Sequence, residues 1–346
     1  MTDYLSDNFT IYCGDVIEKI KEIEDNSVYT CVTSPPYYGL RDYGTGTWVG
    51  GDPNCPHYRT TKIGESTTTG HKSMSEQGES AGDAIYKTVC PLCGAVRVDN
   101  QIGLEETPEE FIDKLVKVFH EVKRVLKDDG TLWVNIGDSY CGSADNIGVY
   151  KNKDLIGIPW MLAFALREDD WYLRQDIIWH KPNPMPESVK DRCTKSHEYI
   201  FLLSKQPKYY FDNKSIQESC VSNTNNPNIK FGGYKYGDNE DEKFATYSGN
   251  TWMPTEKRNK RDVWSVPTKP FKGAHFATFP EDLITPCVLA GCPEGETVID
   301  PFSGSGTTGV VANKHKRKYI GIELNPEYAN MSIDRLKNVN IKKVLW

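Results

Sequence analysis

The stretch Thr33-Ser34-Pro35-Pro36-Tyr37 follows the apolar run 27–32, Ser-Val-Tyr-Thr-Cys-Val. The run predicts a buried strand, and the two prolines predict a stiff corner at its end because proline fixes φ. Neither proline has an N–H, so the carbonyls of Ser34 and Pro35 remain available as acceptors. Tyr37 adds a flat ring on which a guest can stack. The corner therefore suits a planar heterocycle with an exocyclic amino group, which means adenine or cytosine.

Six other apolar runs predict further strands, separated by segments with helical periodicity. The expected strands are 9–13, 28–33, 131–136, 172–179, 198–203, 297–300 and 318–323. The expected helices are 16–23, 109–126, 158–167, 280–290, 308–314 and one at the C-terminus. The helix 109–126 has an N-terminal signature in Thr107, Pro108 and Glu110, and the sequence 128–130 predicts a turn after it. Because strands and helices alternate, we expect an α/β fold with a mostly parallel, seven-stranded sheet and helices on both faces.

Two long stretches, 45–105 and 206–262, have no periodicity and are rich in Gly, Ser, Asn and other polar residues. They predict insertions into a single catalytic framework made of residues 1–44, 106–205 and 263–346. The chain of 346 residues is long enough to bury a full core.

Composition indicates an ordinary globular protein, with 38% hydrophobic and 26% charged residues. No apolar stretch has the length of a membrane span, and the N-terminus lacks the apolar region of a signal peptide. We therefore expect a cytoplasmic protein without a membrane partner, whose ten cysteines stay reduced.

The net charge of −7 is unusual for a nucleic-acid-binding protein. The distribution of charge matters more than the sum, because one segment concentrates basic residues near Trp264. These residues are Lys257, Arg258, Lys260 and Arg261. The segment can contact phosphates, or it can be a solvated loop.

A strand, a glycine-rich turn and a helix start follow one another in Asp300-Pro301-Phe302-Ser303-Gly304-Ser305-Gly306-Thr307. Glycines let the backbone approach a ligand closely, and free N–H groups at a helix start attract an anionic group. Glu323 ends the next strand, close to the spacing at which an acid binds a ribose diol. The pattern predicts a cofactor that contains a nucleoside but is not a nicotinamide dinucleotide.

These two motifs together resemble those of the DNA amino-methyltransferases, which use S-adenosylmethionine to methylate the exocyclic nitrogen of a flipped base. Residues 33–37 resemble the D/S/N-P-P-Y/F motif of that family, and Phe302-Ser303-Gly304-Ser305-Gly306 resembles its F-x-G-x-G motif. Their order, with the catalytic motif first, is similar to the permuted β group found in bacteria and phages. The resemblance implies a Rossmann-like methyltransferase fold.

The resemblance also implies roles for individual residues. The catalytic residues would be Ser34, Pro35, Pro36 and Tyr37. The cofactor would be bound by Asp15, Thr33, Phe279, Asp300, Phe302, Ser303, Gly304, Ser305, Gly306, Thr307, Glu323 and Asn325. The amine would attack the methyl group directly, with Ser34 and the Pro35 carbonyl holding its hydrogens and Tyr37 stacked on the base.

The target base remains open between two candidates. Ser at the first motif position is typical of N4-cytosine enzymes of the family, whereas Asp is typical of N6-adenine enzymes, so we expect N4-cytosine. Methylation at cytosine C5 needs a nucleophilic cysteine, and Cys287 after Pro286 falls inside an apolar helix, where a core position is expected. The sequence is also compatible with a non-catalytic DNA-binding relative, or with a methyltransferase that acts on RNA or on a protein amide.

The first insertion contains a C-x-x-C turn, Cys90-Pro91-Leu92-Cys93, and an upstream Cys55-Pro56-His57. We expect Cys55, His57, Cys90 and Cys93 to bind a structural zinc ion, with His71 as a spare candidate. A redox role is less favoured, because no thioredoxin-like elements flank the turn.

The second insertion has the position at which the family usually reads its target sequence, so we expect recognition of double-stranded DNA there. Its candidate contacts are Tyr209, Tyr210, Tyr234, Tyr236 and Trp252, although these aromatics can equally form a small core. Arg41 and Lys181 flank the expected cleft and are candidate phosphate contacts. A companion restriction endonuclease, and a monomeric or homodimeric state, are also expected.

Overall fold

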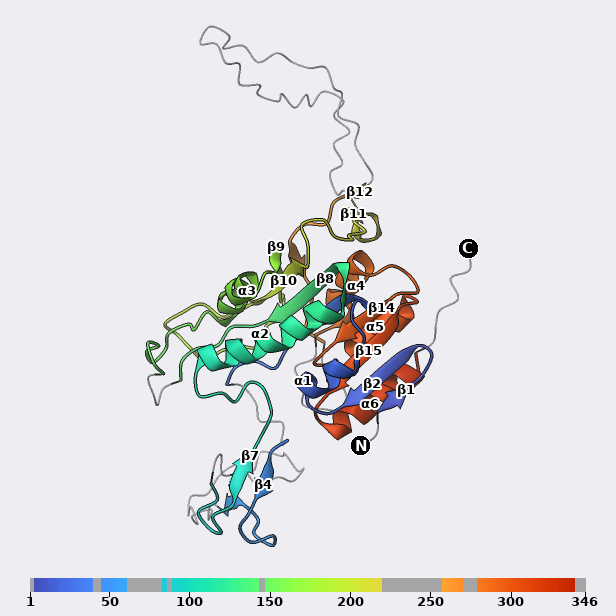
Figure 1. Cartoon of the computed structure of the whole chain (residues 1–346). Coiled ribbons are helices and arrows are strands. Elements are labelled where there is room, and N and C mark those ends of the chain that lie inside the picture. The colour runs from blue at the N-terminus through green and yellow to red at the C-terminus, as the bar shows by residue number, and fades with distance from the viewer. Residues whose placement is uncertain are drawn as a thin grey trace, which may run out of the picture.

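The computed structural model describes residues 3–39, 45–60, 83–85, 89–142, 147–219, 257–269 and 279–339. Its centre is a nine-stranded sheet (Figure 1). In spatial order the strands are β1 (Tyr4–Leu5), β2 (Phe9–Cys13), β15 (Lys318–Glu323), β14 (Thr297–Asp300), β3 (Val28–Thr33), β8 (Leu126–Ile136), β10 (His197–Ser204), β9 (Tyr172–His180) and β13 (Val263–Ser265). The seven predicted strands are all present, and the short strands β1 and β13 extend the sheet at its two edges.

The central strands β2, β15, β14, β3 and β8 run parallel, whereas β10 is antiparallel to both β8 and β9. The chain leaves β14 toward β15 and leaves β3 in the opposite direction, toward β8. The boundary between β14 and β3 is therefore a topological switch point, where open α/β sheets bind ligands beyond the carboxyl ends of their strands. The predicted α/β class, with a mostly parallel sheet, is confirmed.

Helices cover both faces of the sheet (Figure 1). One face packs against α1 (Val16–Lys19), the 3₁₀ turn η1 (Ile20–Glu22), α2 (Pro108–Val125) and α3 (Ile158–Glu168). The other packs against α4 (Glu281–Gly291), α5 (Thr307–Lys314) and α6 (Pro326–Lys337). Both layers position the strand ends that form the cavity described below.

Helix α2 shows why the sequence folds locally as predicted. The Thr107 side chain accepts a hydrogen bond from the Glu110 N–H, and Pro108 starts the helix, where its missing N–H costs nothing. Its apolar stripe, including Phe111 and Leu115, is buried. Each such side chain contributes about 1.5–3 kcal/mol through burial.

The turn predicted at residues 128–130 is wrong. Helix α2 ends at Val125, and β8 begins at once with Leu126, so these residues lie inside the strand. The register of β8 against β3 shifts between Val28 and Thr30, which marks a bulge. A Cβ at Gly130 would lie 2.8 Å from the Lys127 oxygen, so the glycine permits a close backbone approach within the bulge.

The predicted insertions contain short elements of their own. In the first, β4 (Thr47–Val49) pairs with β7 (Val96–Val98), and β5 (Tyr58–Thr60) pairs with β6 (Asp83–Ile85). In the second, the 3₁₀ turn η2 (Lys214–Ile216) precedes β11 (Glu218–Ser219), which pairs with β12 (Lys257–Arg258). Figure 1 shows β4 and β7 away from the main sheet. Within the described ranges, no helix has both the length and the apolar character needed to cross a bilayer.

Candidate functional site

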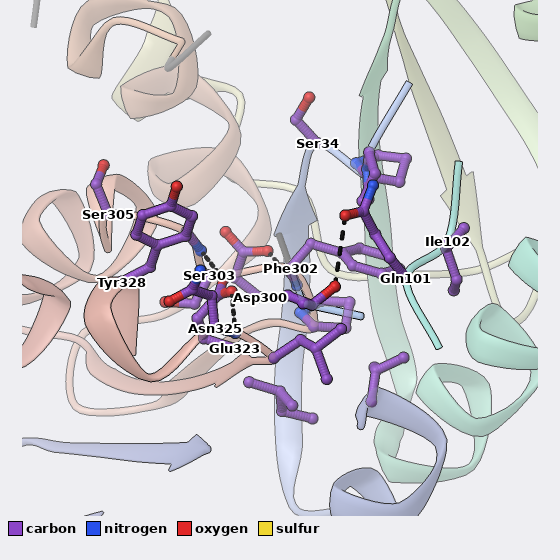
Figure 2. A pocket seen from close by; sticks show the side chains of 18 of the residues that line it. Ser34, Gln101, Ile102, Asp300, Phe302, Ser303, Ser305, Glu323, Asn325 and Tyr328 are labelled. Carbon is purple, nitrogen blue, oxygen red and sulfur yellow. Dashed lines mark hydrogen bonds between the residues drawn. The ribbon is translucent and has the colours of Figure 1, made fainter. Parts of the chain in front are cut away.

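A cavity opens beyond the carboxyl ends of β2, β15, β14 and β3, at the switch point (Figure 2). The Ser34–Tyr37 corner after β3 forms one part of its wall, and the glycine turn after β14 forms another. Glu323 at the end of β15 and Asp15 after β2 complete this edge. The fold therefore brings together two motifs that lie at opposite ends of the chain.

Most of the predicted site residues line this cavity. They are Asp15, Ser34, Pro35, Pro36, Tyr37, Phe279, Asp300, Phe302, Ser303, Gly304, Ser305, Thr307, Glu323 and Asn325. Thr33 and Gly306 do not line it. Thr33 is buried beneath the cavity, and Gly306 caps α5 with a φ of 76°, where a Cβ would lie 2.2 Å from the Ser332 hydroxyl. Both residues support the walls from behind.

The Asp300 carboxylate is a buried hub. Its Oδ1 accepts hydrogen bonds from the Thr33 hydroxyl at 2.6 Å and the Phe302 N–H at 3.0 Å. Its Oδ2 accepts a bond from the Thr308 hydroxyl at 2.7 Å. Burial raises the pKa of Asp300 to about 6, although these bonds act in the opposite direction. Asp300 therefore fastens β3, the glycine turn and α5 to one another.

The Glu323 carboxylate bridges the glycine turn and the start of α6. Its Oε2 accepts a hydrogen bond from the Gly304 N–H at 2.7 Å, and its Oε1 accepts one from the Asn325 N–H at 2.8 Å. Burial raises the pKa of Glu323 to about 7, against the effect of these backbone bonds. The carboxyl group thus has a fixed orientation at the cavity and titrates near neutral pH.

The Tyr37 ring is held by a polar network. Its hydroxyl donates to Glu198 Oε2 at 2.7 Å, and Glu198 forms an ion pair with Lys181. Gly137 leaves room for the ring, since a Cβ there would lie 2.7 Å from Tyr37 Cε2. Lys181 also lies 4.3 Å from the centre of the Trp179 ring. The predicted phosphate contact of Lys181 remains a prediction, and the structure shows this lysine neutralising the carboxylate behind Tyr37.

Some lining residues were missed by the sequence analysis. Gly14 and Val16 flank the predicted Asp15, and Tyr328 lies in the first turn of α6, just after the strand that ends at Glu323. The rule that ligands bind beyond the carboxyl ends of parallel strands would have indicated them. Pro301, Ile322 and Leu324, which are neighbours of predicted residues in the sequence, also line the cavity. Four further lining residues come from the first insertion, which has no periodicity: Thr45, Asn100, Gln101 and Ile102.

The four predicted metal ligands converge in the first insertion. The ligand atoms of Cys55, His57, Cys90 and Cys93 all lie within 4.8 Å of one another. The Cys55 and Cys90 sulfurs are 3.7 Å apart, and the Cys93 sulfur is 3.6 Å from His57 Nδ1. The cluster could hold a metal ion. The spare candidate, His71, lies outside the described residues.

Two predicted basic contacts are engaged with an acid of their own insertion. Arg261 Nε lies 2.8 Å from Glu218 Oε1, and Arg258 Nε lies 3.4 Å from the same oxygen. Lys260 lies 4.9 Å from the centre of the Trp264 ring, whereas Lys257 is exposed on β12. Arg41 lies outside the described residues.

Of the aromatic candidates of the second insertion, two are described by the structure and both pack against other parts of the protein. Tyr210 packs edge-on against Tyr29 of β3 at a centroid distance of 5.3 Å, and Tyr209 receives the Arg174 guanidinium on its ring at 5.5 Å. These two therefore contact the framework. Tyr234, Tyr236 and Trp252 fall outside the described residues.

Cys287 is completely buried inside α4, and burial raises the pKa of its thiol far above the ordinary value. A nucleophilic thiolate needs the opposite environment. The cysteine belongs to the core, as its sequence context predicted.

Comparison with known proteins agrees with this geometry. Residues 28–334 match the model of a DNA methylase family, N6_N4_Mtase. The chain is 41% identical to the type II methyltransferase M.Cfr9I of Citrobacter freundii, over 95% of this chain and 87% of that protein. It is 40% identical to the type II methyltransferase M.SmaI of Serratia marcescens, over 94% of this chain and 90% of that protein.

Among solved structures, the chain resembles the cytosine-N4-specific PvuII DNA methyltransferase. The TM-score is 0.59 at 17% identity, over 98% of this chain and 91% of that one. The Thermus thermophilus protein TTHA0409, solved in complex with S-adenosylmethionine, gives a TM-score of 0.53 at 20% identity, over 97% of each chain. At these identities the likeness shows a shared fold. The family match over most of the chain, together with these two type II relatives, shows that this chain belongs to the N6/N4 family of DNA methylases.

Proposed function

We propose that this DNA methylase transfers a methyl group from S-adenosylmethionine to the exocyclic N4 of a cytosine flipped out of duplex DNA. The observation that carries the proposal is the cavity in which the Ser34–Tyr37 corner faces the glycine turn. The relatives' designation as type II methyltransferases supports DNA as the substrate, with a companion restriction endonuclease.

The residues of the cavity fit a nucleoside cofactor. Glycine φ angles of 50° at Gly304 and 76° at Gly306 create a turn that leaves its backbone open to a close approach. Glu323, fixed by two backbone N–H groups, can accept hydrogen bonds from ribose hydroxyls. Asp15 is oriented by bonds from the Ile17 and Glu18 N–H groups and would contact the adenosine part. When bound, S-adenosylmethionine supplies an electrophilic methyl group on a positively charged sulfur.

The corner would prepare the amine for attack. The Ser34 hydroxyl and the Pro35 carbonyl accept bonds from the amino hydrogens, which turns the nitrogen lone pair toward the methyl group. Tyr37 stacks on the extruded base, and its bond to Glu198 keeps the ring in one orientation. Asp300 fixes the corner relative to the glycine turn through its hydrogen bonds to Thr33 and Phe302.

The choice of cytosine rests on Ser34, the first residue of the corner. The N6 of adenine is the second candidate, because the same two acceptors and the same ring suit its amino group. The framework 1–44, 106–205 and 263–346 would form the catalytic domain. Residues 206–262, with Lys257 exposed at their end, would read the DNA sequence.

Zinc is the metal that best fits the cluster in the first insertion. A tetrahedral zinc ion with Zn–S bonds of about 2.3 Å places two sulfurs about 3.8 Å apart. The observed Cys55–Cys90 separation of 3.7 Å agrees with this spacing. With four protein ligands the site would be closed, so the ion would stabilise the insertion and leave the chemistry to the cavity.

The test is to incubate the purified protein with S-adenosylmethionine and mixed-sequence duplex DNA, digest the DNA to nucleosides, and identify the methylated base by mass spectrometry. N4-methylcytosine is expected. N6-methyladenine would overturn the choice of base while keeping the enzyme. The absence of any methylated nucleoside, with cofactor binding intact, would contradict DNA methyl transfer.

A further inference from the structure

The first insertion contributes a wall of the cavity as well as a metal cluster. Thr45 and Gln101, near its two ends, both line the cavity, and Thr45 Oγ1 lies 3.5 Å from Gln101 Oε1. Gln101 is only 4% exposed. Figure 2 shows Gln101 and Ile102 on one side of the cavity and Ser305 and Tyr328 on the other. An amide at this place can both donate and accept hydrogen bonds to a polar ligand.

A partly buried carboxylate fixes this wall. Asp99 Oδ1 accepts hydrogen bonds from the Thr45 hydroxyl at 2.9 Å and from the Gln101 N–H at 3.0 Å. Its Oδ2 accepts one from Arg97 at 2.8 Å, and the Arg97 side chain is 5% exposed. A Cβ at Gly46 would lie 2.2 Å from Arg97 Nε, so the absence of a side chain at Gly46 leaves room for the guanidinium. Both ends of the insertion are thus joined through one acid.

The same acid connects the wall to the metal cluster. Arg97 lies in β7, where it pairs with Trp48 of β4. The Trp48 ring stacks on the candidate ligand His57 at a centroid distance of 4.4 Å. The Cys90 N–H donates to the Ala95 oxygen at 2.8 Å, immediately before β7. A continuous set of contacts therefore leads from the cluster to Asp99 and on to Gln101.

The wall also contacts the corner that carries Tyr37. The Gly39 N–H donates to the Gly103 oxygen at 2.9 Å. A Cβ at Gly103 would lie 3.0 Å from the Tyr37 oxygen. The backbone around Gln101 is therefore fastened to the metal-holding module on one side and to the catalytic corner on the other.

We propose that Gln101 is a cofactor-binding residue supplied by the insertion, and that the metal in the Cys55–His57–Cys90–Cys93 cluster keeps it in place through Arg97 and Asp99. This inference rests on the proposed function, because it assumes that the cavity takes S-adenosylmethionine. It adds a distinct consequence, which is that cofactor affinity depends on the metal even though the metal is not in the cavity.

The test measures the Kd for S-adenosylmethionine by equilibrium dialysis in the absence of DNA. Gln101→Ala is expected to raise the Kd about three- to tenfold, the loss of one or two hydrogen bonds. Asp99→Asn and removal of the metal with a chelator are each expected to raise it in the same direction. Leu92→Ala, at a side chain of the cluster loop that is 62% exposed, is the matched control and should leave the Kd unchanged.

Gln101→Asn, which keeps the amide but shortens its reach, serves as the second variant if Gln101→Ala does not fold. An unchanged Kd for S-adenosylmethionine in a folded Gln101 variant would overturn the role of Gln101. The same holds if the variant weakens only the binding of DNA, since the amide would then contact the base. An unchanged Kd after verified metal loss would overturn the coupling. If the unaltered protein binds no cofactor, the proposed function itself fails; if it binds and methylates normally, only this inference is at stake.

Discussion

The Thr33 hydroxyl lies 2.6 Å from Asp300 Oδ1, joining two residues that are 267 positions apart in the chain. Thr33 ends β3 immediately before the Ser34–Tyr37 corner, and Asp300 ends β14 immediately before the glycine turn. The pairing of β3 with β14 fixes their register, and this bond fixes the two loops that leave them. The distance between the two halves of the cavity, which we propose bind the base and the cofactor, therefore depends on this buried contact.

Thr33→Val removes this hydroxyl while keeping the side-chain shape. We expect the free energy of unfolding to fall by about 1.5–3 kcal/mol at pH 8, where Asp300 is ionised and the bond is charge-assisted. The loss should be smaller at pH 5, below the Asp300 pKa of about 6, because the carboxyl is then neutral. Urea unfolding at both pH values measures the difference, with Thr33→Ser, which retains the hydroxyl, as the control. Equal losses at both pH values would contradict an ionised hub.

The raised pKa of Glu323 predicts a pH-dependent stability. The folded protein keeps the proton up to about pH 7, whereas the unfolded chain loses it near the ordinary value of 4.5. The folded state binds more protons in this window, so the free energy of unfolding should fall as the pH rises from about 4.5 to 7. Glu323→Gln should reduce that slope. An unchanged slope would show that Glu323 is not the titrating group.

The same group predicts pH-dependent ligand binding. Ribose hydroxyls donate to the ionised carboxylate, so binding should strengthen as Glu323 loses its proton. We expect the Kd for 5′-methylthioadenosine, which has the ribose but lacks the titratable amino acid part of the cofactor, to fall about three- to tenfold from pH 6 to pH 8. Isothermal titration calorimetry measures it, with Glu323→Gln as the variant that should show a flat profile. A flat profile in the unaltered protein would remove Glu323 from the ribose site.

The Tyr37–Glu198 bond predicts unequal effects of two substitutions. Tyr37→Phe keeps the stacking ring and loses only the hydroxyl, so kcat/KM should fall about three- to tenfold. Tyr37→Ala also loses the stacking surface, so its kcat/KM should fall by about a further tenfold or more. Steady-state methylation of duplex DNA gives both values, and cofactor Kd should stay unchanged in each. Similar losses in the two variants would indicate that the hydroxyl, and not the ring, is what matters.

The metal cluster predicts a specific elemental composition. Protein purified without added metal should contain stoichiometric zinc by elemental analysis, and Cys93→Ser should lose it. Cys193→Ser is the matched control, since Cys193 is exposed and outside the cluster. Zinc retained in Cys93→Ser, or absent from the unaltered protein, would rule out the proposed site.

The sequence predicts the framework well because its signals are local. Each of the seven main strands is an apolar run, and α2 is fixed by its own cap at Thr107 and its own stripe. The error at 128–130 arose because an Asp-Asp-Gly turn signal is also compatible with a bulged strand. Pairing with β3, a contact distant in sequence, decides between the two.

The site was predictable where a motif is compact and not where contacts assemble across the fold. The corner, the glycine turn and the four metal ligands are short patterns with a chemical reason for their residue types. Gln101 and Thr45 gave no such signal, because their place in the wall depends on partly buried hydrogen bonds to Asp99 and on how an aperiodic insertion returns to the framework. The hydrogen bond between Tyr37 and Glu198 joins residues 161 positions apart, and its geometry depends on the pairing of β10 with β8.

The most direct test of the shared cavity compares Ser34→Ala with the unaltered protein in two assays on the same preparation. One measures transfer of a labelled methyl group from S-adenosylmethionine to duplex DNA, and the other measures the Kd of the cofactor. We predict that Ser34→Ala loses transfer by about a hundredfold or more and keeps its cofactor Kd, because Ser34 holds the amine and not the cofactor. Undiminished transfer by a folded Ser34→Ala protein would contradict the assignment of this corner as the site of methylation.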